Sequence, residues 1–177
     1  CSEAASVKGE EDTLEDIQAK ARRTLEEIFP NADVVGLADV VHPDCVNHEA
    51  PPGVPQGLEG MQQIMLWLNR AFSDLHYEIH QVVAQGDTVA VFCTMTGRHT
   101  GEFMGIPATH RSVESSQAHR VRFQDGKSIE HWAVRDDLTL MQQLGVFPPE
   151  GVPVVIAAKT MDMEIRPQVG NPAKRGR

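Results

Sequence analysis

Side chains that can donate or accept protons are concentrated on two consecutive segments whose sequence pattern predicts a β-hairpin. Asp125-Gly126 separates the two segments, and this dipeptide between alternating stretches is typical of a two-residue hairpin loop. If the loop holds only these two residues, the pairing register of the strands is fixed. Because side chains alternate across a strand, one face of the hairpin then carries a polar set with one aromatic residue: Ser115, Gln117, His119, Trp132 and Asp136.

The same register assigns the remaining side chains to the opposite face. That face receives Ser116, Ala118, Arg120, Arg122, Ile129, His131 and Arg135. A change of one residue in the pairing would exchange the two faces. The first set is therefore a conditional prediction of a pocket wall in which histidine, glutamine and aspartate lie beside apolar groups.

Asp136 is the residue of this set best suited to acid or base chemistry. A carboxylate beside Trp132 and Val134 loses solvation, which raises its pKa towards the range where it exchanges protons near neutral pH. An alternative is structural: Asp136 precedes a helical pattern that runs to Leu144, where an aspartate can cap the first turn. Local sequence leaves both roles open.

Metal chemistry finds little support among the eight histidines and three cysteines. His76 and His80 point the same way on a strand but lie roughly 13 Å apart, too far to share one ion. The cysteines, Cys1, Cys45 and Cys93, form no CxxC pair and no even disulfide framework. We therefore expect neither a metal nor another cofactor.

Four helices and a four-segment sheet are predicted to position these residues. Apolar side chains recur at helical spacing from about residue 12 to 28, then at 32–41 and at 58–72, and a final helix is expected over 136–144. Alternating segments cover 76–85, 88–98, 111–124 and 127–135, with turn signals at Gly86-Asp87 and Asp125-Gly126. Helices followed by an antiparallel sheet predict an α+β domain with the helices on one face of the sheet.

Composition excludes several classes of protein. The chain has 177 residues, 41% hydrophobic and 23% charged, enough for one globular domain. Its net charge of −9 disfavours nucleic acid as a partner, and no apolar run is long enough to span a membrane. The acidic surplus lies before residue 151, so a neutral, apolar substrate is favoured over an anionic one.

The two ends of the chain differ from the predicted domain at 12–147. Residues 1–11 are a polar, acidic lead and 148–177 an extension with a basic tail. We expect a cytoplasmic protein. The alternative is a lipid-anchored or exported one, because a mature bacterial lipoprotein begins with a cysteine, as this chain does at Cys1.

Several segments together resemble the SnoaL-like polyketide cyclases, also called ester cyclases, across roughly residues 15 to 147. The similar stretches are Cys45-Val46-Asn47-His48, Gly57-Leu58-Glu59-Gly60, the loop 97–109, the hairpin 125–132, and the helix 138–145 with its Gln142-Gln143-Leu144-Gly145 ending. The resemblance implies the nuclear transport factor 2-like fold, in which a curved antiparallel sheet wraps a conical cavity closed by N-terminal helices. It also implies a homodimer or higher homo-oligomer.

The family resemblance also implies a reaction and a set of residues. Its characterised members close a polyketide ring by intramolecular aldol condensation without metal or cofactor, with one aspartate as acid/base. That aspartate matches Asp136, and the family's Gln-x-His matches Gln117 and His119. His48 matches an early histidine that could orient substrate, and His99 is a candidate pocket residue. For both histidines a purely structural role is equally open.

The sequence thus predicts a cofactor-independent enzyme that acts on a polyketide-like or other enolisable carbonyl compound. Asp136 and His119 are its expected catalytic residues, and the expected substrate contacts are Gln117, His48, His99 and Trp132. Two alternatives keep the fold: an epoxide hydrolase or isomerase, and a binding module that carries an apolar small molecule without catalysis.

Overall fold

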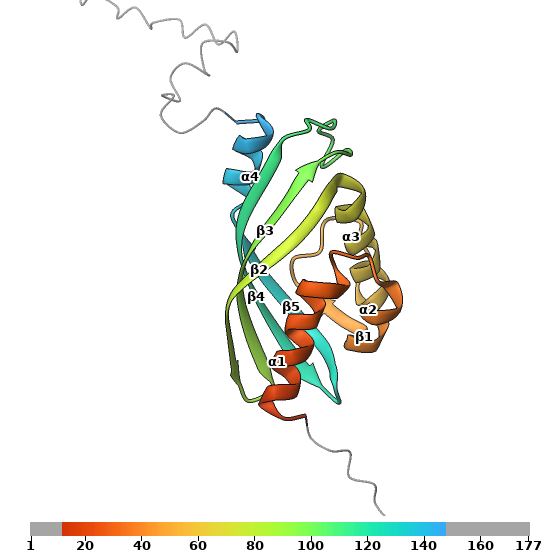
Figure 1. The fold of residues 1–177 in the computed structure, drawn as a ribbon. Helices are drawn as coiled ribbons and strands as arrows, with labels where there is room; N and C mark the ends of the chain where they lie inside the picture. The colour runs from red at the N-terminus through yellow and green to blue at the C-terminus, as the bar shows by residue number, and fades with distance from the viewer. Residues whose placement is uncertain (1–11, 148–177) are drawn as a thin grey trace, which may run out of the picture. The chain divides into compact units, whose positions relative to one another are not determined.

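The computed structural model describes residues 12–147, which form four α-helices, one π-helical segment and a five-stranded sheet (Figure 1). The helices are α1 (Leu14–Arg23), α2 (Val34–Val40), α3 (Gly57–Ala71) and α4 (Asp137–Leu144), and the π-helical segment η1 (Thr24–Ile28) continues α1. The strands are β1 (Val41–Asn47), β2 (Phe72–Gln85), β3 (Thr88–His99), β4 (Ser112–Gln124) and β5 (Lys127–Arg135). The predicted lead at 1–11 and extension at 148–177 lie outside the described residues.

The first predicted helix is confirmed, and its start follows from a capping box. The Thr13 hydroxyl accepts a hydrogen bond from the Asp16 backbone N–H at 3.1 Å, and the Asp16 carboxylate accepts one from the Thr13 N–H at 3.0 Å. Of the apolar side chains that recur at helical spacing, four lie in the core, Ile17, Ala21, Leu25 and Ile28, whereas Leu14 at the start of the helix is exposed. This stripe packs α1 and η1 against the inner face of the sheet.

One strand, β1, is not predicted from the sequence because its signal is weak. The segment predicted as helix at 32–41 ends at Val40, and β1 follows it, although Pro43 interrupts its alternation. β1 is an edge strand that pairs with β5 in parallel, with Asn47 beside His131. An edge strand tolerates proline because one side of it needs no ladder hydrogen bonds. The sheet, expected to be wholly antiparallel, is therefore mixed.

The other predicted elements are confirmed to within a few residues. The helix expected at 58–72 is α3, and its two methionines Met61 and Met65 are buried in the core. The sheet order is β1-β5-β4-β3-β2, so the four antiparallel strands follow one another as a meander. Asp125 and Gly126 have φ of 50° and 80°, which is the conformation that a two-residue hairpin loop requires. The α+β fold class is confirmed.

Irregular pairing shifts the register of the hairpin that β4 and β5 form. Gln124 pairs with Lys127 and Phe123 with Ser128, as predicted, but Arg122 then pairs with Glu130. The extra residue, Ile129, is a β-bulge, and it exchanges the faces of every later β5 side chain. The prediction that Trp132 shares the face of His119 is therefore wrong.

The bulge gives the inner face of the sheet a different set of β5 side chains. His119 pairs with Ala133 and Gln117 with Arg135. Because directly paired residues project to the same side of a sheet, the inner face carries Ala133 and Arg135 together with His131, two residues before Ala133. His131 and Arg135 had been predicted on the opposite face.

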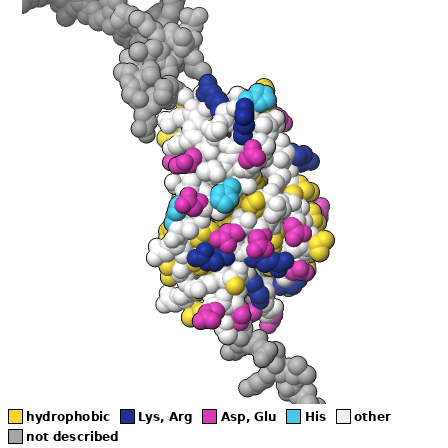
Figure 2. All heavy atoms as spheres, viewed as in Figure 1, with side chains coloured by type: hydrophobic (Ala, Val, Ile, Leu, Met, Phe, Trp, Pro, Cys, Tyr) yellow, Lys and Arg dark blue, Asp and Glu magenta, His cyan; other side chains and the backbone are white. Residues whose placement is uncertain are grey.

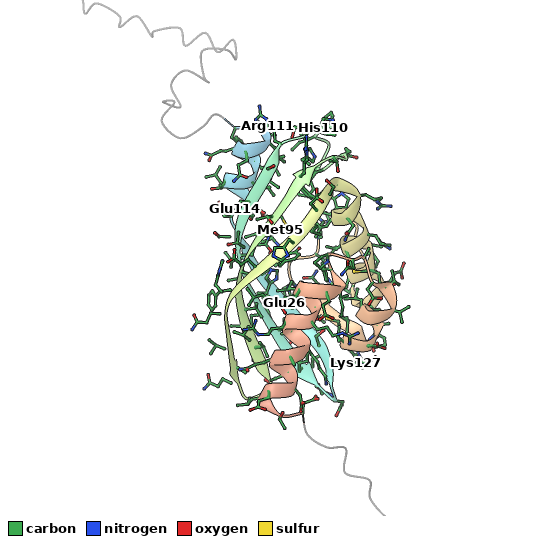
Figure 3. All side chains as sticks on the ribbon, viewed as in Figure 1. Glu26, Met95, His110, Arg111, Glu114 and Lys127 are labelled. Carbon is green, nitrogen blue, oxygen red and sulfur yellow. The ribbon has the colours of Figure 1, made fainter. Side chains whose placement is uncertain are left out.

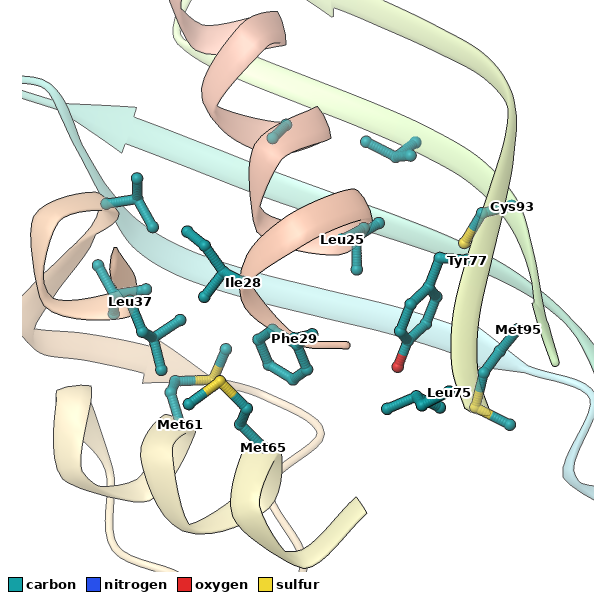
Figure 4. Packing of buried hydrophobic residues seen from close by; sticks show 14 of the residues in the cluster. Leu25, Ile28, Phe29, Leu37, Met61, Met65, Leu75, Tyr77, Cys93 and Met95 are labelled. Atoms are coloured by element: carbon teal, nitrogen blue, oxygen red, sulfur yellow. The ribbon is translucent and has the colours of Figure 1, made fainter. Parts of the chain in front are cut away.

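The hydrophobic core lies between the sheet and the helices. Figure 4 shows Leu25, Ile28 and Phe29 from the first helical stretch facing Tyr77, Cys93 and Met95 of the sheet, with Met61 and Met65 of α3 below them. Acidic and basic side chains are interspersed on the face drawn in Figure 2. Among residues 12–147, no helix is both long and apolar enough to cross a membrane.

The short helix α4 is fixed to the sheet by side-chain hydrogen bonds. The guanidinium of Arg111 donates to the Gln143 carbonyl at 3.0 Å, and the Gln143 side chain binds both the N–H and the carbonyl of Glu114. Figure 3 shows Arg111 and Glu114 beside this helix. The contacts hold the last turn of α4 against the start of β4.

Candidate active site

A cavity of about 630 Å³ lies between the inner face of the sheet and the helices α1, η1 and α3. This volume falls within the range of small-molecule sites. Apolar side chains make up most of its wall, among them Leu25, Phe29, Met61, Leu68, Val91 and Leu140. The helices and the sheet thus enclose a space for a ligand with a largely apolar surface.

Part of the cavity wall is aromatic. Trp67 of α3 stacks on Phe103, with ring centroids 4.8 Å apart and an angle of 16° between the planes. Phe72 meets the edge of Phe103 at 5.0 Å, and all three residues line the cavity. Stacked and edge-on rings of this kind favour a flat, ring-containing ligand.

The polar part of the wall is a hydrogen-bonded chain of four side chains. Nδ1 of His131 lies 3.0 Å from Oδ1 of Asn47, and Nε2 of His131 lies 3.0 Å from Nδ1 of His119. At the far end, Nε2 of His119 lies 2.9 Å from Oε1 of Gln117. All four residues line the cavity and are buried, so the chain places two imidazoles against an apolar space.

Burial keeps both imidazoles neutral. Loss of solvation lowers the pKa of His131 to about 4, and the positive charge of Arg135 contributes in the same direction. Burial also lowers the pKa of His119 well below its ordinary value, helped by His131 and Arg135. At neutral pH each imidazole therefore has a nitrogen lone pair that can accept a proton or a hydrogen bond.

Charged side chains also reach the cavity. Arg135 projects from the end of β5, Asp137 from the start of α4, and Glu49 from the segment after β1. Neither acidic residue forms an ion pair with Arg135. The cavity wall therefore contains one arginine and two acidic side chains as well as the two neutral imidazoles.

The structure places Asp136 outside this cavity. Its carboxylate caps α4, because Oδ1 accepts a hydrogen bond from the Thr139 N–H at 3.0 Å, and the side chain is exposed. Hydrogen bonds from the side chain and backbone of Thr139 lower the pKa of Asp136. The expected placement beside His119 and the expected rise in pKa are both wrong, and the alternative capping role is the one observed.

His48 and Trp132 lie on the outer side of the sheet rather than in the cavity. Their rings stack with centroids 4.4 Å apart and planes 6° from parallel. The guanidinium of Arg120 lies 4.0 Å from the Trp132 ring, and His48 Nε2 lies 3.5 Å from a Glu130 oxygen. Neither residue is among those that line the cavity, so the structure does not place them for the predicted substrate contacts.

His99 is buried but does not line the cavity either. Its Nδ1 accepts a hydrogen bond from the Thr109 N–H at 3.2 Å and lies 3.0 Å from the Thr109 hydroxyl. The ring packs against Phe72 and Phe103, two residues of the aromatic wall. His99 thus supports the wall from behind, which is the structural alternative left open by the sequence.

Of the six predicted site residues, Gln117 and His119 are brought together in the cavity. The residues that the sequence did not single out are Asn47, His131, Arg135 and Tyr77. Alternation along β5 would have found His131 and Arg135 if the bulge at Ile129 had been known. Within residues 12–147, no group of three histidine, cysteine or acidic side chains is arranged to hold a metal ion.

Comparison with known proteins finds relatives that are named as ester cyclases. It is 31% identical over 126 residues to aklanonic acid methyl ester cyclase DnrD of Streptomyces peucetius, covering 70% of this chain and 87% of that protein. It is 29% identical over 109 residues to nogalonic acid methyl ester cyclase of Streptomyces nogalater, covering 60% and 81% of the two chains.

Solved structures show the same fold. TsrD from Streptomyces laurentii superposes with a TM-score of 0.72 at 27% identity, over 77% of this chain and all of that one. IdmH from Streptomyces antibioticus gives a TM-score of 0.62 at 32% identity, over 72% and 96% of the two chains. The family model described as SnoaL-like polyketide cyclase matches residues 19–144. The chain belongs to the SnoaL-like polyketide cyclase family.

Proposed function

We propose that this protein catalyses the aldol-type closure of a ring in a polyketide ester, or related acid–base chemistry on an enolisable carbonyl compound. The observation that supports this most strongly is the buried Asn47–His131–His119–Gln117 chain at the wall of an apolar cavity. An apolar cavity excludes water and orients the two reacting carbons. The imidazoles supply the base that such a reaction requires.

The neighbouring hydrogen bonds determine which atom donates and which accepts along the Asn47–His131–His119–Gln117 chain. Oδ1 of Asn47 accepts the Glu49 N–H at 3.1 Å, so this atom is an acceptor and His131 Nδ1 must donate to it. In a neutral pair, His131 Nε2 then accepts from His119 Nδ1–H. The remaining lone pair lies on His119 Nε2, beside the side-chain amide of Gln117. His119 Nε2 is therefore the proposed site of proton uptake.

The orientation of the Gln117 side-chain amide depends on whether His119 Nε2 carries a proton. In the neutral pair the amide turns its NH₂ towards His119 Nε2, because two lone pairs cannot share a hydrogen bond. Once Nε2 carries a proton, the amide oxygen Oε1 can accept a hydrogen bond from Nε2–H. In that arrangement Oε1 lies 2.9 Å from Nε2. The NH₂ group is then free to donate to an oxygen in the cavity.

The proposed reaction follows from these two states. Substrate displaces the Gln117 amide, and His119 Nε2 removes a proton from the carbon next to a carbonyl. The resulting enolate carbon attacks a second carbonyl of the same molecule, which forms the new carbon–carbon bond. The alkoxide so produced takes the proton back from His119, so the product is an isomer of the substrate and the enzyme is regenerated.

The proposal assigns the base to His119 and gives Asp136 a structural role. Both were predicted as catalytic residues, but only His119 lines the cavity. Asp136 holds the first turn of α4, which presents Asp137 and Leu140 to the cavity. The relatives named as aklanonic and nogalonic acid methyl ester cyclases suggest the methyl ester of a polyketide acid as substrate.

The test is turnover of aklanonic acid methyl ester and nogalonic acid methyl ester, followed by chromatography as formation of a product of unchanged mass. We expect turnover by the wild-type protein. His119→Gln should lower kcat at least a hundredfold with KM changed less than threefold, because general bases contribute on the order of 10²–10⁴. Asp136→Asn, which can still cap the helix, is the matched control and should retain most activity.

Two results would contradict the proposal. If Asp136→Asn abolishes turnover while His119→Gln retains it, the aspartate is the acid/base despite its exposed position. If the wild-type protein binds the esters but converts none of them, the cavity belongs to a carrier.

A further inference from the structure

Arg135 is a half-buried positive charge in the cavity wall that forms no ion pair with any of residues 12–147. It pairs with Gln117 across β4 and β5, which places its side chain on the inner face of the sheet, and it lines the cavity. Among residues 12–147, its guanidinium makes no ion pair. Arg122 differs, because it pairs with Glu130 and with Asp87 on the outer side.

The buried side chains on which the charge of Arg135 acts are themselves uncharged. Burial keeps His119 and His131 neutral, and the pKa of each imidazole is lowered further by the charge of Arg135. The same charge acts on the buried thiol of Cys93. The guanidinium therefore lies close to several uncharged cavity groups, and the two acidic residues of the cavity wall, Glu49 and Asp137, form no ion pair with it.

A second donor without a partner lies in the same cavity. Tyr77 of β2 is 3% exposed, lines the cavity, and its hydroxyl makes no hydrogen bond with any described residue. In Figure 4 its ring lies in the space between the sheet and Phe29. Burial raises the pKa of Tyr77, and Arg135 acts on it in the opposite direction. The hydroxyl is thus protonated and available as a donor.

We propose that Arg135 and the Tyr77 hydroxyl form a subsite for an oxyanion, so that the physiological ligand is an otherwise apolar molecule with a free carboxylate. A guanidinium presents paired donors that match the geometry of a carboxylate. An unpaired charge beside an apolar space is costly, and an anionic ligand would remove that cost. The subsite lies in the cavity of the proposed function and rests on that function only in assuming that the ligand enters this cavity.

This assignment departs from two simpler expectations. The net charge of −9 favours a neutral substrate, but the wall of the cavity, rather than the whole surface, sets the charge that a bound ligand meets. The curated relatives are named for methyl esters, in which the carboxylate is masked. A preference for the free acid over its ester would distinguish this protein from those names.

The experiment compares two probes that differ only in this group, 2-naphthoate and methyl 2-naphthoate, by isothermal titration of the full-length protein at low salt. The wild-type protein should bind the acid at least tenfold more tightly than the ester. Arg135→Gln should remove this preference and leave ester affinity within twofold. Tyr77→Phe should weaken acid binding severalfold, with ester binding unchanged.

Two further variants separate the charge from its geometry and position. Arg135→Lys keeps the charge but loses the paired donors, and should retain only part of the preference. Arg120→Gln, on the outer side of the sheet beside Trp132, should leave both affinities unchanged.

The proposal is overturned if the wild-type protein binds both probes equally, if it binds neither, or if Arg135→Gln keeps the preference. These outcomes concern binding alone. Turnover of the methyl esters by the wild-type and His119→Gln proteins tests the proposed function separately, so that either proposal can fail while the other stands.

Discussion

Burial lowers the pKa values of His119 and His131, and the hydrogen bond between the two rings determines which nitrogens carry protons. Gln117 and His119 could be predicted because they lie two residues apart on a strand with a recognisable turn beyond it. Asn47 could not, since its contact with His131 joins β1 to β5 across 84 positions of the chain. A base whose proton position depends on such a contact becomes visible only once the fold is known.

The lowered pKa of His131 predicts how stability depends on pH. The unfolded chain binds a proton near pH 6.5, whereas the folded chain does so near pH 4. Between these values the unfolded state holds more protons, so the free energy of unfolding must fall as the pH falls. From pH 7 to pH 5 we expect His131 to account for a loss of about 2 kcal/mol, measurable by urea denaturation.

Variants isolate this contribution. His131→Asn should be less stable at pH 7 but should lose less on acidification than the wild-type protein. His76→Asn, at an exposed position of β2, is the matched control and should keep the full dependence. An unchanged pH dependence in His131→Asn would show that His131 takes up its proton equally in both states.

At the scale of elements, the bulge at Ile129 decides which residues form the site. The strand boundaries and the Asp125-Gly126 turn could be predicted, because alternation and turn chemistry are local. The bulge could not, because a single extra residue leaves no compositional trace, yet it exchanges Trp132 for His131 and Ala133 on the inner face. The parallel strand β1 was missed for a related reason, since it is stabilised by a distant partner rather than by its own pattern.

Asp136 gives a prediction at the same scale. Because its carboxylate caps α4, Asp136→Ala should lower the free energy of unfolding by about 1 kcal/mol, whereas Asp136→Asn should cost a few tenths at most. Urea denaturation of the two variants measures the difference. Equal stabilities for Asp136→Ala and the wild-type protein would remove the capping role and reopen a functional one.

At the scale of the whole molecule, the predicted homodimer or higher homo-oligomer remains a prediction. The outer side of the sheet offers a surface for it, because Phe92, Ala118 and Val134 lie side by side on three strands. Val134 is 75% exposed and Phe92 44%. Exposed apolar side chains in a contiguous row are typical of interaction surfaces, and the cavity on the inner side would remain open to ligand.

Sedimentation equilibrium tests this arrangement. We expect the wild-type protein to be at least a dimer and Val134→Glu to be a monomer, because a buried carboxylate without a partner opposes association. Val35→Glu changes a side chain of equal exposure on α2 and should leave the assembly intact. A monomeric wild-type protein, or assembly that survives Val134→Glu, would exclude this surface.

In the proposed reaction, the buried histidine pair takes the proton from carbon at His119 Nε2. Proton abstraction can be observed without ring closure as exchange of deuterium from D₂O into the enolisable position of aklanonic acid methyl ester, followed by NMR. We predict exchange with the wild-type protein and Asp136→Asn, and loss of at least a hundredfold in rate with His119→Gln. Exchange that persists in His119→Gln and disappears in Asp136→Asn would contradict the account.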